Sequence, residues 1–87
     1  MALSKQVTVS FPEGIHARPA AQVVKLASSF TSDMRMAANG KTVNLKSIVS
    51  VMAAGIKASQ IIELQADGAD EANAIGALVH FFESGGK

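Results

Sequence analysis

The amino-acid sequence predicts an α+β fold in which a small antiparallel or mixed sheet carries its helices on one face. Two segments, near residues 17–29 and 70–84, place apolar residues at the spacing of an amphipathic helix. Four shorter segments have strand character; they lie within residues 3–11, 33–38, 41–45 and 59–66. With a short helix before the last strand, the order is β-α-β-β-α-β-α, which is typical of helices packed against one side of a sheet.

The first strand and the first long helix follow from two different periods. Leu3, Val7, Val9 and Phe11 fall on one parity, interrupted only by Lys5, so one face of this strand is expected to be buried. A helix is then expected from about Ala17 to Ser29, because apolar residues recur at helical spacing and form one stripe, while Gln22 and Lys25 face away from it. The stripe consists of Ala20, Val23, Val24, Ala27 and Phe30.

A hairpin and a short helix are expected next. Met34, Met36 and Ala38 alternate with their neighbours, and Asn39-Gly40 supplies two residues that tolerate positive φ before the segment "KTVNL". Ser47 is a suitable N-cap for a helix that carries Ile48, Val51 and Met52, and Gly55 is a natural stop for it.

The last strand and the last helix complete the pattern. Ile62, Leu64 and Ala66 lie on one face of "SQIIELQA", and the Asp67-Gly68 turn follows. Asp70 and Glu71 suit the positive end of a helix that ends at Gly85-Gly86, with an apolar stripe of Ile75, Leu78, Val79 and Phe82. The other face of the sheet is expected to be wet; the alternating polar residues are Thr8, Ser10, Arg35, Thr42 and Glu63.

Composition limits the class of protein. A chain of 87 residues that is 48% hydrophobic is expected to form one domain over residues 1–87. The net charge of +1 lacks the electrostatic footprint of a nucleic-acid binder, and the absence of cysteine excludes disulfides and thiolate zinc sites. No stretch is apolar enough for a signal peptide or a membrane span, so we expect a cytoplasmic, soluble monomer without metal or cofactor.

The strongest local signal is "GIHARPA" at residues 14–20. If His16 is the N-cap and Ala17 the first helical residue, Pro19 falls in the first turn, where no intrahelical acceptor awaits an N–H. The free N–H groups of Ala17 and Arg18 and the positive helix end favour an anion beside the imidazole. Arg18 adds a guanidinium that binds phosphate oxygens in pairs, so His16 has the surroundings of a phosphoryl acceptor. The competing interpretation is a surface capping histidine, and the lack of a second base nearby disfavours an independent enzyme.

Longer motifs distinguish these interpretations. The segments "GIHARPAAQVVKLAS", "NGKTVNLKSI" and "ADGADEA" resemble, at matching intervals, the HPr family of histidine-containing phosphocarriers of the bacterial phosphoenolpyruvate-dependent sugar phosphotransferase system. The resemblance covers essentially the whole chain. It implies an open-faced β-sandwich with a four-stranded antiparallel sheet and three helices on one face.

The resemblance also implies roles. Enzyme I would phosphorylate His16 at Nδ1, Arg18 would bind the phosphate with a backbone donor from Ala17, and IIA domains of sugar permeases would receive the phosphoryl group. In the Gram-positive type, the residue matching Ser47 is phosphorylated by HPr kinase/phosphorylase, which weakens transfer from enzyme I and recruits a catabolite control regulator. An apolar partner-binding patch would consist of Ala20, Ile48, Val49 and Met52.

Some features depart from the family pattern or remain ambiguous. Glu13 stands where a small polar residue is usual, and its carboxylate would oppose a phosphate on His16. Val49, Ser50 and Ala54 differ from the usual segment, and Ile48 and Met52 could instead belong to the core. His80 is expected to be an exposed helix residue. The alternatives to a sugar phosphocarrier are a regulatory binding module that acts through phospho-Ser47, a nitrogen-related phosphocarrier and an unrelated α+β binding domain.

Overall fold

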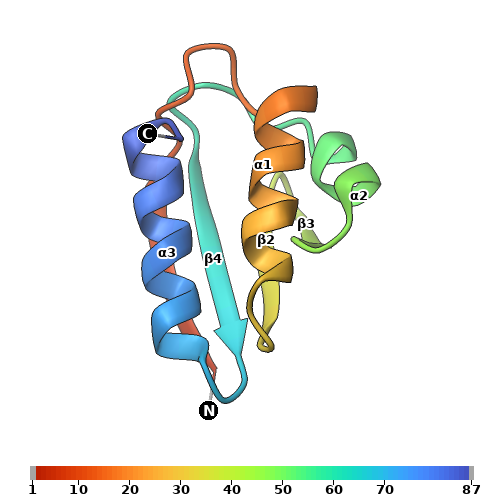
Figure 1. Cartoon of the computed structure of the whole chain (residues 1–87). Helices are drawn as coiled ribbons and strands as arrows, with labels where there is room; N and C mark the ends of the chain where they lie inside the picture. Colours follow the sequence, from red (N-terminus) through yellow and green to blue (C-terminus); the bar gives the residue numbers. More distant parts are fainter. Residues whose placement is uncertain (1, 87) are drawn as a thin grey trace.

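The computed structural model describes residues 2–86 and contains the seven elements in the predicted order (Figure 1). They are β1 (Leu3–Thr8), α1 (Ala17–Ser28), β2 (Asp33–Ala38), β3 (Lys41–Asn44), α2 (Ile48–Ala53), β4 (Ile61–Asp67) and α3 (Glu71–Ser84). The four strands form one sheet in the order β1-β4-β2-β3, with every neighbouring pair antiparallel. The predicted α+β class with an open four-stranded sheet and three helices is therefore confirmed.

The register of the sheet places alternate residues in the core. Val7 pairs with Ile62 and Met36 pairs with Leu64, and all four side chains are buried. The hairpin between β2 and β3 turns through Asn39 and Gly40, whose φ angles are 54° and 74°. Two successive positive φ angles match the right-handed twist of a two-residue hairpin, which is why Asn-Gly occurs here.

The core lies between the sheet and the helices. Helices α1 and α3 run side by side across one face of the sheet, and α2 packs against α1 and β3 (Figure 1). The stripe residues Ala20, Val23 and Ala27 of α1 are buried, whereas Val24 and Phe30 are half-buried. Leu3 was expected on the buried face of β1 but is 36% exposed, because it lies at the end of an edge strand.

Three residues outside the helices and strands also belong to the core; they are Ile15, Leu45 and Ile56, each no more than 5% exposed. Leu45 ends the segment that was expected as a strand, whereas no periodic pattern includes Ile15 or Ile56. Backbone hydrogen bonds hold them there: the Ile15 N–H donates to the Ile56 carbonyl at 3.0 Å, and the Leu45 N–H donates to the Met34 carbonyl at 2.9 Å. The loop before α1 is thereby fixed to the loop after α2.

Asp70, the N-cap of α3, joins two segments far apart in sequence. Its carboxylate accepts hydrogen bonds from the N–H groups of Thr31 and Ser32 and from the Ser32 hydroxyl. The bond from the Ser32 hydroxyl and then those from the two N–H groups lower the pKa of Asp70 from 3.8 to about 2. The side chain therefore holds the α1–β2 loop rather than capping its own helix.

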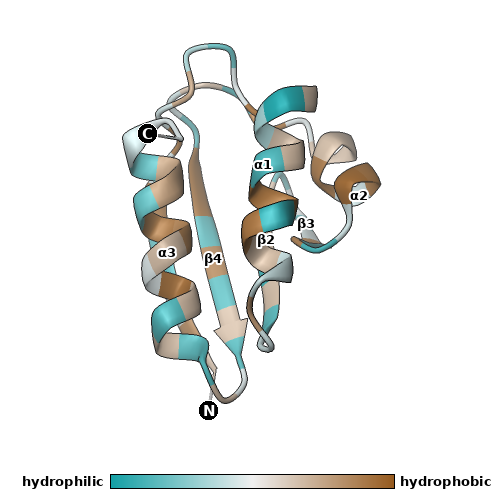
Figure 2. Cartoon of the chain, in the orientation of Figure 1, coloured by the Kyte–Doolittle hydropathy of each residue, from teal (hydrophilic) through white to brown (hydrophobic). Residues whose placement is uncertain are grey.

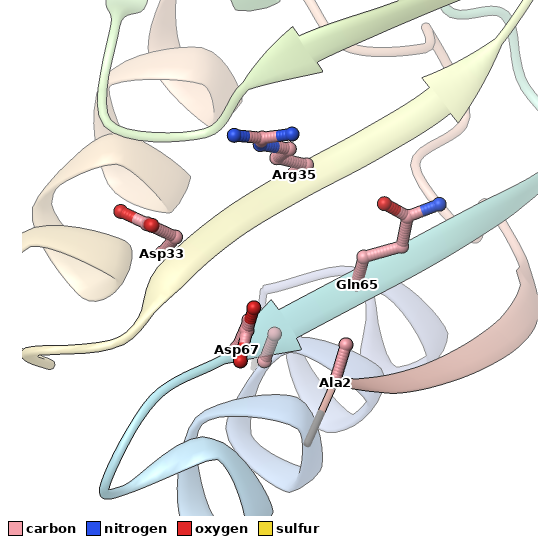
Figure 3. A pocket seen from close by; sticks show the side chains of 6 residues that line it. Ala2, Asp33, Arg35, Gln65 and Asp67 are labelled. Atoms are coloured by element: carbon pink, nitrogen blue, oxygen red, sulfur yellow. The ribbon is translucent and has the colours of Figure 1, made fainter.

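The opposite face of the sheet is open and mainly polar, as expected. Figure 3 shows a shallow depression at one end of it, where Arg35 and Gln65 lie beside the cross-strand pair Asp33 and Asp67. Ile61, which is 64% exposed, is a large apolar side chain on this face. Among residues 2–86, no helix is both long and apolar enough to cross a membrane.

Candidate functional site

A tight turn sets the geometry of the loop between β1 and α1. The Gly14 N–H donates to the Phe11 carbonyl at 3.0 Å, so Pro12 and Glu13 occupy the two central positions of the turn. Proline and glycine at these places are typical of a β-turn. Gly14 has φ of +73°, and a Cβ there would lie 2.4 Å from the Ile56 carbonyl oxygen. Only glycine lets the loop approach this backbone so closely.

His16 is the N-cap of α1, as the sequence predicts. Its backbone is extended, its carbonyl accepts the Ala20 N–H at 2.9 Å, and its side chain makes no capping bond. The imidazole therefore takes no part in capping the helix. The N–H groups of Ala17 and Arg18 belong to the first turn and have no intrahelical acceptor, while Pro19 has no N–H. No acidic residue occupies this first turn, so its positive end is not offset from within the helix.

His16 and Arg18 line one shallow depression on the surface. Its other walls are Phe11, Pro19, Gln22, Gly85 and Gly86. Gly85 and Gly86 follow α3, so the segment directly after α3 lies beside the start of α1. This neighbour was absent from the sequence-based prediction, since it depends on tertiary contacts: Phe11 packs against Phe81 and Phe82, and the Ser10 N–H donates to the Phe82 carbonyl at 3.0 Å. Gln22 was also missed, although it lies one turn after Arg18 on the same helix.

Glu13 contacts the imidazole directly. Its Oε2 lies 3.4 Å from Nε2 of His16, and the two side chains are 82% and 51% exposed. A carboxylate at this distance attracts a protonated imidazole nitrogen and repels a phosphate placed nearby. The depression thus contains a guanidinium and, at its edge, a carboxylate.

Ser47 caps α2, the second site that the sequence singles out. Its Oγ accepts the Ser50 N–H at 3.4 Å, and its side chain is half-buried. Lys46 precedes it and donates from Nζ to the Phe30 carbonyl at 2.9 Å, which ties the start of α2 to the end of α1. A phosphate on Ser47 would add negative charge at the start of this short helix.

An apolar patch covers the outer side of α2. Ile48, Val49 and Met52 are 40%, 75% and 46% exposed, while Val51 of the same helix is fully buried. Ile48 and Met52 are therefore surface residues rather than core residues. Ala20 was expected in this patch but is fully buried, because it faces the core from the first turns of α1. Figure 2 shows hydrophobic residues along α2 at the outer edge of the molecule.

The structure separates the remaining candidates from this site. His80 is exposed on α3, as expected, and does not line the depression that contains His16. Within the described part of the chain, no three His, Cys, Asp or Glu residues come together as metal ligands could. The depression of Figure 3 lies at the other end of the sheet from the His16 loop (Figure 1).

Known proteins resemble this chain over nearly its whole length. Residues 3–84 match the family model described as the PTS HPr component phosphorylation site. The phosphocarrier protein HPr of Bacillus anthracis str. Ames is 36% identical, with a TM-score of 0.91 over 94% of this chain and 98% of that one. HPr-C-His from Thermoanaerobacter tengcongensis is 38% identical, with a TM-score of 0.92 over 97% of this chain and 94% of that one.

A regulatory relative is also similar. Crh, described as a catabolite repression protein of Bacillus subtilis that forms a dimer by domain swapping, is 36% identical, with a TM-score of 0.78 over 93% of each chain. The chain is therefore similar both to HPr proteins and to a protein described by its role in catabolite repression.

Proposed function

The chain belongs to the HPr family of phosphocarriers of the phosphotransferase system, and on that premise we propose that His16 accepts and passes on a phosphoryl group. The donor is phosphorylated enzyme I, and the recipients are IIA domains of sugar permeases. The observation that carries the proposal is the exposed imidazole of His16 at the start of α1, with Arg18 in the same depression.

The chemistry of the site supports a transient phosphohistidine. The Nδ1 lone pair of His16 attacks phosphorus, the new N–P bond forms, and the electron pair of the broken bond stays with the donor. The first-turn N–H groups of Ala17 and Arg18, together with the Arg18 guanidinium, then bind the phosphoryl oxygens. The same contacts stabilise the group during its transfer in either direction.

The surroundings of His16 favour a carrier over an independent enzyme. The depression is shallow, and the described residues that line it include no second histidine and no carboxylate to activate water; Glu13 lies at its edge, in contact with Nε2 of His16. A partner must therefore supply the remaining groups for each transfer. We propose that the protein works in the cytoplasm as a monomer and without a cofactor.

The patch formed by Ile48, Val49 and Met52 is the proposed docking surface for enzyme I and the IIA domains. Three exposed large apolar side chains on a helix of six residues are unusual for a surface of this size and typical of a binding site. Ala20 is not part of this surface, because its side chain is fully buried.

A second proposed function is regulation through Ser47. Ser47 immediately precedes the docking patch, and the similarity to Crh favours a role in catabolite repression. Phosphorylation by HPr kinase/phosphorylase would add about −1.5 to −2 charges beside the patch, repel acidic surfaces of enzyme I and provide a site for the catabolite control regulator. Ser47→Asp should slow transfer from enzyme I. Ser4→Asp, on the open sheet face, is the matched control, and equal rates for the two variants would contradict the regulatory role.

Labelling with phosphoenolpyruvate and enzyme I tests the carrier function. His16→Ala should accept no phosphoryl group, whereas His80→Ala should accept it at the wild-type level, since His80 is the other histidine of the chain and lies outside the site. Labelling of the folded His16→Ala protein would overturn the assignment. Its stability should change by less than about 0.5 kcal/mol, because the exposed imidazole makes no capping bond.

A further inference from the structure

We infer that Glu13 is a positioning residue that holds a proton on Nε2 of His16 and so leaves the Nδ1 lone pair for the phosphoryl group. The inference rests on the proposed function of His16 and adds to it a residue outside the phosphate-binding set. Its basis is the contact of 3.4 Å between Oε2 of Glu13 and Nε2 of His16.

The backbone of the loop holds Glu13 at this place. Glu13 is the third residue of the turn that the Gly14 N–H closes on the Phe11 carbonyl. Phe11 is buried at one end of the turn, and at the other end the Gly14 backbone lies against Ile56 and Lys57. The Ile15 N–H bonds to the Ile56 carbonyl directly after the turn, so the segment that joins Glu13 to His16 is fixed at both ends.

The chemistry of the pair favours one tautomer. A neutral imidazole carries one N–H and one lone pair, and an ionised carboxylate only accepts hydrogen bonds. Glu13 therefore stabilises the tautomer with the proton on Nε2, which makes Nδ1 the nucleophile. Among the described residues that line the depression, Arg18 carries the charge, and its guanidinium attracts the phosphate but provides no acceptor for the Nε2 proton.

The same contact persists through the transfer. As the Nδ1–P bond forms, the donor retains the electron pair of the broken bond, and the ring becomes a phosphoimidazolium whose proton remains on Nε2. No proton has to leave during the step. Glu13 attracts the charged ring at Nε2 and repels the phosphate on Nδ1. Because these two effects oppose each other, the carboxylate affects the position of the proton more than the phosphorylation equilibrium.

Nitrogen-15 NMR of the histidine rings tests the tautomer without any phosphoryl donor. At alkaline pH, the ratio of the Nε2–H to the Nδ1–H tautomer of His16 should fall about 1.5- to 5-fold in Glu13→Ala, the range expected for an exposed charge contact. Glu13→Gln should retain part of the preference, because the partial negative charge of its amide oxygen can lie against Nε2 in the same way. Asp67→Asn removes the same charge at the far end of β4 and should leave the ratio unchanged.

Potassium phosphoramidate then tests the consequence with a small phosphoryl donor that releases ammonia. Phosphorus NMR should find the wild-type phosphate on Nδ1, and the ratio of Nδ1 to Nε2 product should fall about 1.5- to 5-fold in Glu13→Ala. Unchanged tautomer and product ratios in Glu13→Ala would overturn the inference. A Glu13-dependent tautomer in a protein that enzyme I does not phosphorylate would instead contradict the proposed function and leave the role of Glu13 in place.

Discussion

Replacing Gly14 with alanine should destabilise the protein and displace the His16 loop. Gly14 has φ of +73°, where alanine costs about 1–2 kcal/mol relative to an ordinary backbone conformation. Its Cβ would also lie 2.4 Å from the Ile56 carbonyl oxygen and 3.0 Å from Cα of Lys57, both backbone atoms with little freedom to move. Crowding of this kind adds about 1–3 kcal/mol, so Gly14→Ala should lose about 2–5 kcal/mol in all.

Gly40→Ala separates the two contributions. Gly40 has nearly the same φ, +74°, but apart from its chain neighbours no atom of the described residues lies within 4 Å of the position of its Cβ. Urea and thermal unfolding can be followed by circular dichroism. The free energy of unfolding of Gly14→Ala should be lower than that of Gly40→Ala by about 1–3 kcal/mol, and its Tm should be lower by at least about 4 °C. Labelling by enzyme I should slow only in Gly14→Ala. Equal stability of the two variants would refute the argument that close backbone approach requires glycine before the site.

Three further predictions concern the core, the hydrogen bonds between Asp70 and the α1–β2 loop, and the apolar patch on α2. Leu78→Ala, at a fully buried position, should cost about 2–5 kcal/mol in urea unfolding, and a loss below about 1 kcal/mol would contradict the packing. Asp70→Asn should flatten the acid side of the stability profile: the lowered pKa of Asp70 gives a stabilisation that is complete above pH 3.8 and lost as the pH falls toward about 2. An unchanged profile would exclude this linkage. Val49→Ser, at a 75% exposed position, should leave the free energy of unfolding within about 0.5 kcal/mol but raise KM in transfer from enzyme I, whereas an unchanged KM would remove Val49 from the docking surface.

Local signals explain why much of the site was predictable from the sequence. The N-cap at His16 and the first-turn Pro19 define the start of α1 within a few residues. Ser47 likewise marks the start of α2, and Gly55 marks its end. Asn39-Gly40 likewise determines the hairpin, since few other pairs adopt two positive φ angles. Each of these features depends on neighbours along the chain rather than on the packed fold.

Contacts between distant segments account for what the sequence did not predict. Ile15 and Ile56 enter the core because their loops share a backbone hydrogen bond, a pairing without periodic signature. Asp70 appeared suited to the end of its own helix, yet its carboxylate bonds to a loop 38 and 39 residues away. Helical spacing placed Ala20 correctly in the buried stripe of α1, and its assignment to the partner-binding patch, which came from the family resemblance, was wrong.

The most direct test of the carrier function is a phosphoryl balance over both transfers. The protein, charged with labelled phosphoenolpyruvate and enzyme I and then freed of both, should hold close to one phosphoryl group per chain as an acid-labile phosphohistidine on Nδ1 of His16. Addition of a purified IIA domain should discharge it, and the label should appear on that domain. A label absent from His16, or one that remains on the chain when the IIA domain is added, would contradict the account.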